Sequence, residues 1–362
     1  MSPTIENQSR SEASPRHDPQ RELDVLLKGA GIAALEDTGW LRISGADRVR
    51  WLNGMVTNSI QDLGAGEGSY NFFLNAQGRI QGDGSIFAEH DHLLLETDRS
   101  QLANLVSLLD RFIIMDEVEL SDVTDGMTGI LLAGPKVPEL LSSLELLPGE
   151  CGAPGLSLER RSGDILLIRA YSPLVPRFEI WSDEGRIREI SARAKASGAT
   201  PCTPAALELL RIYEGTPRFG VDIRGRDLPQ ETGASRALHF AKGCYLGQEI
   251  VERIRSRGNV HRTFRAFRLQ GDEASRSNTL SVDGKPVGEL TSVAYVSSIS
   301  LEGGMQIGLG YVRRDALEQG GPIQYEGGTA LPVTLPFALP HANDFSPTDQ
   351  TNRLVKTLSN ER

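Results

Sequence analysis

The feature that most constrains the fold is the order in which helix-like and strand-like segments follow one another. From about residue 22 to 262, strand-like alternation and helix-like spacing are mixed without the regular repeat of a doubly wound parallel sheet. From about residue 263 to 340 the chain is rich in glycine, with short strand-like runs separated by turn signals such as Asp283-Gly284. Short, evenly spaced strands favour a small barrel. The sequence therefore predicts an α+β fold followed by a C-terminal β-barrel.

This pattern divides the chain into five parts. Residues 1–21 are polar, contain prolines and lack periodicity, so we expect a disordered tail. Residues 341–362, rich in Asn, Asp, Ser and Thr, have the same character. Between the tails we expect an α+β domain at 22–127, a second at 128–262, and the barrel at 263–340.

Composition argues against several classes of protein. The net charge of −10 disfavours broad nucleic-acid binding, which needs a basic face. No apolar run reaches the roughly 18 residues that span a bilayer, and the polar N-terminus lacks a signal-peptide core. The odd number of cysteines, without metal-type Cys/His spacing, favours neither a disulfide framework nor a resident metal. We expect a cytoplasmic monomer with no DNA and no membrane partner.

One eight-residue stretch carries the clearest chemistry: Lys242-Gly243-Cys244-Tyr245-Leu246-Gly247-Gln248-Glu249. It places a thiol between a lysine and the start of a predicted amphipathic helix. The N–H groups of a helix start and a nearby ammonium both lower a thiol pKa, and the thiolate is the reactive form. The alternative is an inert, buried cysteine. The local sequence thus makes Cys244 a candidate nucleophile and Lys242 its candidate activator.

Arginines crowd the segment that follows, at residues 250–268, where Glu252 is the one acid. They are Arg253, Arg255, Arg257, Arg262, Arg265 and Arg268. A solvated basic strand or loop is one interpretation. The other is a cradle for an anionic ligand or an acidic partner surface, because guanidinium groups pair bidentately with carboxylates.

The octapeptide resembles the corresponding loop of the YgfZ family, folate-binding proteins that assist iron–sulfur cluster assembly and repair. That family is related to the glycine-cleavage T-protein, an aminomethyltransferase. The resemblance covers nearly all of the chain between the tails, including residues 51–58, 74–79, 211–220 and 308–314. It implies two intertwined α+β domains and a β-barrel, arranged as a three-leaf ring around a central folate channel.

Particular residues separate the two branches of this superfamily. The T-protein resembles this chain around 242–249 but carries Asp at the position of Cys244 and Lys or Arg at that of Gln248. Its pterin-binding acid matches Tyr213, with Glu214 shifted by one, and a pterin-binding Asn matches Thr97. These departures favour the YgfZ branch.

Two other positions favour the enzyme branch. The key aspartate of the T-protein matches Asp83, and a folate-site tyrosine matches Tyr70. Asp83 could orient or polarise a folate or an attacking amine. A turn acid within Gln81-Gly82-Asp83-Gly84 is the structural alternative.

The resemblance implies a tetrahydrofolate, or a one-carbon-substituted form, in the central channel. Cys244, Lys242 and Asp83 are then the candidate catalytic residues. The candidate folate-binding residues are Tyr70, Asp83, Leu95, Thr97, Tyr213 and Glu214, with Arg253 and Arg255 at the glutamate tail.

The leading hypothesis is a tetrahydrofolate-binding protein that supports assembly or repair of iron–sulfur clusters in client enzymes through Cys244. The alternative is a folate-dependent aminomethyltransferase or another one-carbon transferase of the T-protein type. Whether the protein is an enzyme is open at this point. The expected partners are folate and iron–sulfur client proteins or assembly factors.

Overall fold

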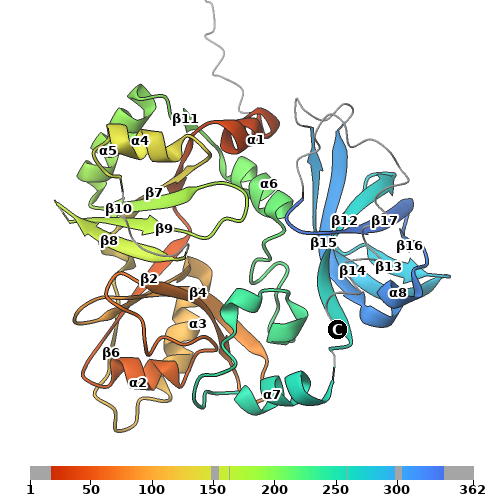
Figure 1. Ribbon diagram of the computed structural model, residues 1–362, viewed down its shortest axis with the longest axis horizontal. Helices are drawn as coiled ribbons and strands as arrows, with labels where there is room; N and C mark the ends of the chain where they lie inside the picture. The colour runs from red at the N-terminus through yellow and green to blue at the C-terminus, as the bar shows by residue number, and fades with distance from the viewer. Residues whose placement is uncertain (1–17, 148–154, 163, 259, 298–303, 338–362) are drawn as a thin grey trace, which may run out of the picture.

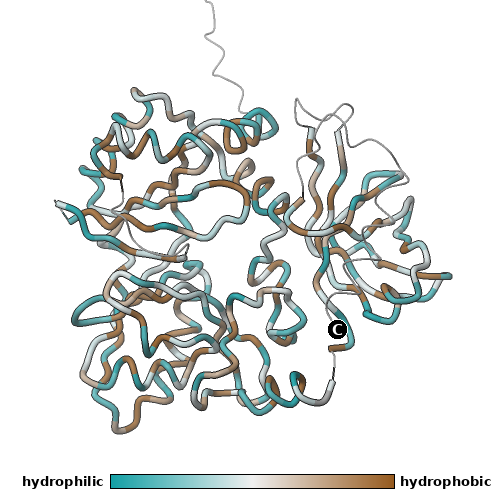
Figure 2. Tube along the Cα trace, in the orientation of Figure 1, coloured by the Kyte–Doolittle hydropathy of each residue, from teal (hydrophilic) through white to brown (hydrophobic). Residues whose placement is uncertain are grey.

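The structure is a computed structural model and describes residues 18–147, 155–162, 164–258, 260–297 and 304–337. Two sheet-based lobes lie on one side of helix α6 (Pro204–Glu214) and a barrel lies on the other (Figure 1). Figure 2 shows hydrophobic stretches within the strands of all three lobes. This arrangement confirms the predicted α+β fold with a C-terminal β-barrel.

The first lobe holds an antiparallel sheet in the order β3-β4-β5-β2-β6. Its strands are β2 (Thr38–Ser44), β3 (Gly68–Leu74), β4 (Ile80–Ala88), β5 (Leu93–Asp98) and β6 (Glu119–Asp122). Helix α3 (Arg99–Asp110) packs across β2, β4 and β5. Helix α2 (Arg48–Asn53) follows β2, and the short 3-10 helix η1 (Thr124–Gly126) follows β6. The turn between β3 and β4 is closed by the bond from Asn75 N–H to the Arg79 carbonyl.

The second lobe holds a sheet in the order β11-β1-β7-β10-β9-β8. Its strands are β1 (Gly31–Leu35), β7 (Thr128–Ala133), β8 (Ser157–Arg161), β9 (Ile165–Arg169), β10 (Arg177–Ser182) and β11 (Thr200–Pro201). Helix α5 (Glu184–Ala196) packs on this sheet, and α4 (Val137–Ser143) follows β7. Because β1 pairs with β7, residues 31–35 belong to the second lobe and not to the predicted domain 22–127. The two domains intertwine through this strand.

The third lobe is a closed barrel in the order β12-β15-β14-β13-β16-β17. Its elements are β12 (Arg262–Gly271), β13 (Thr279–Val282), β14 (Lys285–Val296), β15 (Met305–Arg313), α8 (Arg314–Gln319), β16 (Ile323–Tyr325) and β17 (Gly328–Val333). Gly310 permits the close approach of β15 to β14, since a Cβ there would lie 2.2 Å from the Glu289 carbonyl oxygen.

The remaining helices connect the lobes. They are α1 (Pro19–Lys28), η2 (Pro229–Glu231), η3 (Ser235–Ala237) and α7 (Gln248–Arg257). Helix α6 packs against α1, β14 and β15. Asp18 caps α1 by accepting from the backbone N–H of Gln20, so the predicted tail at 1–21 extends three residues too far. The predicted tail at 341–362 lies outside the described residues.

The two sheets meet through an apolar interface. Trp40, Phe87 and Leu94 of the first sheet pack on Leu166, Ile168 and Trp181 of the second. Trp40 and Trp181 meet edge to face, with ring centroids 5.3 Å apart. Because both tryptophans are almost fully buried, this contact fixes the relative position of the sheets, and with it the polar side chains described next.

Candidate functional site

A cluster of polar side chains begins on the neighbouring strands β3 and β4. The hydroxyl of Tyr70 donates to Asp83 Oδ2 at 2.6 Å. Gln101, on α3, donates to Asp83 Oδ1 at 2.9 Å and accepts from the Asp83 backbone N–H at 3.1 Å. Burial raises the pKa of Asp83, and these hydrogen bonds to its carboxylate offset part of that rise. Asp83 is therefore held in one orientation, and its pKa lies above the usual value for an aspartic acid.

Helix η3 brings an arginine against this pair. The Arg236 guanidinium carbon lies 4.4 Å from the ring centroid of Tyr70 and 3.9 Å from that of Tyr171, so the cation sits between two aromatic rings. Arg236 Nε is buried and has no hydrogen-bond partner among the described residues. Burial raises the pKa of both Asp83 and Glu214, and the positive charge of Arg236 offsets part of that effect at each.

The last residue of α6 supplies a second carboxyl group. Glu214 is 5% exposed and accepts a hydrogen bond from the hydroxyl of Ser172, in the loop after β9. Tyr213, its neighbour, is fully buried and stacks on Phe337 in an apolar core. Of the two predicted folate-binding residues on α6, Glu214 therefore joins the polar cluster and Tyr213 does not.

The side chains of strand β5 point alternately to opposite faces of the first sheet. Leu95 is fully buried in the apolar core beneath α3, so its side chain is not available to a ligand. Thr97 is also buried, and its hydroxyl donates to the Asp83 carbonyl at 2.7 Å, which fixes β4. Glu96, between them, points to the second sheet. Burial and the negative charge of Glu179 raise the pKa of Glu96 well above its usual range.

Glu179 lies on β10 and is 3% exposed. It accepts from Arg177 and from the Trp181 indole, each at 3.2 Å. Two buried carboxyl groups in contact share a proton more readily than both ionise. Sequence reasoning missed Glu96, although period-two alternation places it on the same strand face as Leu94. It also missed Tyr171, Ser172 and Arg236, which come from irregular segments that carry no periodic signal.

The thiol lies in a different part of the first lobe. Cys244 is exposed and free, in the loop that precedes α7. The Lys242 ammonium donates to the carbonyl oxygens of Asn53, Val56 and Asn58 at 2.6–2.7 Å. The predicted role of Lys242 beside the thiol must therefore be revised. Its donors are used on backbone carbonyls at and beyond the end of α2, and Lys242 anchors the loop.

The other motif residues also fix this loop. Tyr245 is buried with Phe72 and Val251, and the Lys242 ammonium lies 5.2 Å from its ring. Gly247 has φ 80° and caps α7, and a Cβ there would lie 2.6 Å from the Asn75 carbonyl oxygen. The motif thus holds a rigid loop that leaves its cysteine in solvent.

Asn58 connects this loop to the polar cluster. Its carbonyl accepts from Lys242, while its side-chain amide donates to the carbonyls of Arg236 at 2.9 Å and Tyr70 at 3.2 Å. Thr57, the preceding residue, donates to the Ala237 carbonyl at 2.6 Å. One short segment therefore positions both the thiol loop and the arginine between the tyrosines.

The arginines of residues 250–268 lie in different surroundings. Arg253 and Arg255 are exposed on α7, and Arg255 stacks on Phe240 at 4.6 Å. Within the described residues, no hydrogen bond or ion pair joins either arginine to the polar cluster, so their predicted contact with a glutamate tail stays a prediction. Arg262 pairs with Asp227 at 2.5 Å and Glu231 at 3.2 Å and serves the structure.

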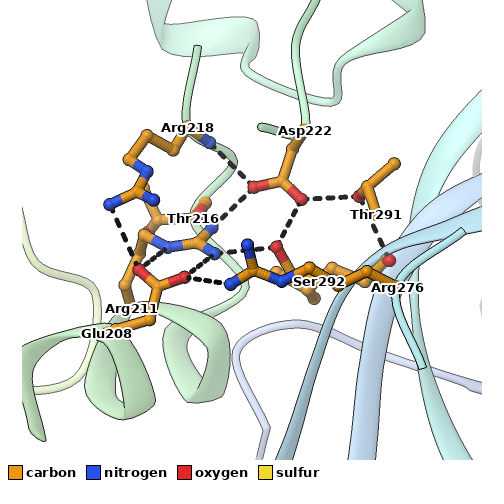
Figure 3. A network of polar contacts seen from close by, with 9 residues as sticks. Glu208, Arg211, Thr216, Arg218, Asp222, Arg276, Thr291 and Ser292 are labelled. Carbon is orange, nitrogen blue, oxygen red and sulfur yellow. Dashed lines mark hydrogen bonds and ion pairs between the residues drawn. The ribbon is translucent and has the colours of Figure 1, made fainter. Parts of the chain in front are cut away.

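A second polar network joins the central segment to the barrel (Figure 3). Asp222 is fully buried and accepts from Arg211 at 2.7 Å, Thr291 at 2.5 Å and Ser292 at 2.7 Å. Arg211 also pairs with Glu208 at 2.8 Å. Because every buried charge in this network has a partner, we infer that the network serves to attach the barrel to the central segment.

In the part of the chain that the structure describes, no group of three or more His, Cys, Asp or Glu side chains could hold a metal ion. No helix in that part is long and apolar enough to cross a membrane.

Comparisons with known proteins agree with this fold. A family model described as the GCVT N-terminal domain matches residues 11–147. The crystal structure of glycine cleavage system aminomethyltransferase T from Bartonella henselae has the same fold, with a TM-score of 0.78 at 19% identity, covering 88% of this chain and 89% of that one.

The relatives by sequence carry different names. A chloroplastic putative transferase of Arabidopsis thaliana is 28% identical over 313 residues, 83% of this chain and 69% of its own. An aminomethyltransferase of Nostoc sp. is 24% identical over 333 residues, 87% and 85%. The tRNA-modifying protein YgfZ of Yersinia enterocolitica is 26% identical over 229 residues, 63% and 67%. A mitochondrial iron–sulfur cluster assembly factor IBA57 homologue of Pyricularia oryzae is 26% identical over 240 residues, 64% and 56%.

The three lobes have the aminomethyltransferase fold. In sequence the chain is similar to members of the superfamily that unites YgfZ with the glycine-cleavage T-protein. Some of its relatives are named for chloroplasts or mitochondria, so the cytoplasmic location stays a prediction.

Proposed function

We propose that the protein binds tetrahydrofolate at the polar cluster and supports assembly or repair of iron–sulfur clusters in client proteins through Cys244. One observation carries the proposal: contacts of Lys242, Tyr245 and Gly247 fix the loop, while Cys244 on that loop is free and exposed. An exposed thiol on a fixed loop can reach a client protein, whereas a buried structural cysteine cannot. The iron–sulfur role named for the IBA57 homologue supports this interpretation.

The residues of the polar cluster fit a folate. Asp83 and Glu214 offer acceptors to the N–H groups on the edge of a pterin ring, and Tyr70 and Tyr171 offer flat aromatic faces. Gln101 keeps the Asp83 carboxyl group oriented. Tetrahydrofolate, when bound, would supply a carrier for one-carbon groups; this chain's own contribution is to orient it and to hold a proton on Asp83.

Calorimetric titration with tetrahydrofolate under anaerobic conditions tests the binding. We expect the wild type to bind and Asp83→Asn to bind about tenfold more weakly, since an amide replaces a charged acceptor. Asp283→Asn, at an exposed turn, is the matched control and should bind like the wild type. Absence of binding by the wild type would remove folate from the proposal.

The thiol is tested in cells that lack the protein. We expect Cys244→Ser to fail to restore the activity of iron–sulfur client enzymes, and the buried-site control Cys202→Ala to restore it. Full restoration by Cys244→Ser would contradict a working thiol.

A second function is favoured by the Tyr70–Asp83 pair, because a carboxyl group with a raised pKa suits proton transfer to or from an amine. This is aminomethyl or one-carbon transfer to folate. Formation of methylene-tetrahydrofolate from an aminomethylated carrier protein is its assay. Turnover that persists in Cys244→Ser and is lost in Asp83→Asn would establish the transferase in place of the thiol mechanism.

A further inference from the structure

Arg236 is held in a way that is unusual for a partly buried arginine. Its guanidinium lies between the rings of Tyr70 and Tyr171, at 4.4 and 3.9 Å. Among the described residues its side chain makes no ion pair, and its buried Nε has no hydrogen-bond partner. Buried polar groups normally have such partners. The side chain is therefore held by its contacts with the two rings, which are weak interactions.

The two rings are spaced for one planar group. A guanidinium is flat and delocalised, and it stacks on aromatic faces much as a heteroaromatic ring does. Both separations fall well within the roughly 6 Å of a cation–π contact. The Tyr70 hydroxyl is fixed on Asp83, so that wall of the slot is rigid. Tyr171 is 43% exposed, so the other wall faces solvent.

The backbone beneath Arg236 is firmly anchored. Asn58 donates to the Arg236 carbonyl at 2.9 Å and Thr57 donates to the Ala237 carbonyl at 2.6 Å. Because the backbone of η3 is held, the guanidinium would leave the slot by rotation of its side chain. Its departure would expose a slot flanked by the carboxyl groups of Asp83 and Glu214. The positive charge of Arg236 acts on both groups, although no hydrogen bond or ion pair joins them among the described residues.

We infer that Arg236 is a removable internal plug, whose guanidinium fills the slot between Tyr70 and Tyr171 in which a planar heteroaromatic ring of the ligand stacks. The carboxyl groups beside the slot specify a ring with N–H donors on its edge. This inference rests on the proposed folate binding and adds to it a step of competition: the ligand and the protein's own arginine exchange places. Ligand affinity is then set partly by the contacts that the arginine must give up.

Binding of tetrahydrofolate to Arg236→Ala, followed by anaerobic calorimetry, tests the plug. Removing two cation–π contacts that the ligand would otherwise break should lower Kd about 5- to 30-fold. Tyr171→Ala removes one wall of the slot and should raise Kd at least about fivefold. Arg188→Ala, which deletes an exposed arginine on α5, should leave Kd unchanged. If Arg236→Ala fails to fold, Arg236→Met, which keeps an apolar side chain, should lower Kd by the same factor.

The outcomes separate the plug from the folate site itself. A Kd for Arg236→Ala equal to or above that of the wild type would overturn the plug and leave folate binding intact. Binding by Arg236→Ala without measurable binding by the wild type would support the plug in its strongest form. Absence of binding by the wild type and by both Arg236 variants would overturn the plug and the folate site together.

Discussion

Replacing Lys242 with methionine should detach the cysteine loop from the end of α2. The variant keeps the aliphatic length of the side chain but leaves three carbonyl oxygens, those of Asn53, Val56 and Asn58, without their donor. A hydrogen bond from a charged group contributes about 1.5–3 kcal/mol when fully buried. Because Lys242 is half-buried, water replaces part of each bond, and we assign about 1 kcal/mol to each. The expected loss is about 3 kcal/mol.

Hydrogen exchange measures this loss where it occurs. The backbone N–H of Leu246 donates to the Gly54 carbonyl, and that of His239 donates to the Thr57 carbonyl, so both report on the attachment of the loop. A loss of about 3 kcal/mol should speed exchange at Leu246 by about 100-fold. Lys195→Met, on the exposed face of α5, is the matched control and should leave exchange at Leu246 unchanged.

The same variant separates two roles for the lysine. Burial lowers the pKa of Lys242 to about 7. The three carbonyl acceptors favour the protonated amine, because they match its three N–H donors. If Lys242 instead activates the thiol, Lys242→Met would shift the pH–rate profile of Cys244 alkylation and leave exchange at Leu246 within about threefold of the wild type. That result would refute the anchoring role.

Three other predictions concern stability and reactivity. Asp222→Ala removes one of the two carboxylate partners of Arg211 and the acceptor of Thr291 and Ser292, so it should lower the free energy of unfolding by about 3 kcal/mol in urea, whereas Asp62→Ala, at an exposed turn, should change it little. The pKa of Glu96 is higher in the folded protein than in the unfolded chain, so folding takes up a proton and stability falls as pH rises toward that pKa. Glu96→Gln, whose amide donates permanently to Glu179, should therefore be about 1 kcal/mol more stable than the wild type at pH 8 and should show a smaller fall in Tm between pH 5.5 and 8; an unchanged fall would contradict a shared proton. Burial raises the pKa of Cys202 to about 11, so iodoacetamide at pH 8 should label Cys244 and spare Cys202 in the native protein, as peptide mapping by mass spectrometry would show; equal labelling would mean that Cys202 is accessible.

The sequence predicted those parts of the fold that depend on local pattern. The start of α7 at Gln248 and the short strands of the barrel follow from apolar spacing and turn chemistry. The assignment of β1 to the second lobe depends on a partner strand far along the chain, and no local pattern in residues 31–35 encodes it.

The candidate site shows the same limit. Tyr70 and Asp83 lie diagonally across β3 and β4, on the same face of the two paired strands. The resemblance to the T-protein favoured Thr97 and Tyr213. In the structure the Thr97 hydroxyl bonds the Asp83 carbonyl, Tyr213 lies in an apolar core, and its neighbour Glu214 joins the polar cluster. Lys242 was placed beside the thiol from sequence proximity alone, and the carbonyls that bind its ammonium come from a segment that the sequence separates widely from it.

The pairing of β1 with β7 has a consequence for how the chain folds. The whole first lobe is an insertion between two strands that lie side by side, so β1 emerges from the ribosome well before its partner exists. The first sheet is complete within residues 38–122 and needs no strand from elsewhere. Folding in order of synthesis would therefore close the inserted lobe first and leave an unpaired strand edge waiting for β7. Because closing such a long loop slows strand pairing, the second sheet should be the last of the two to form.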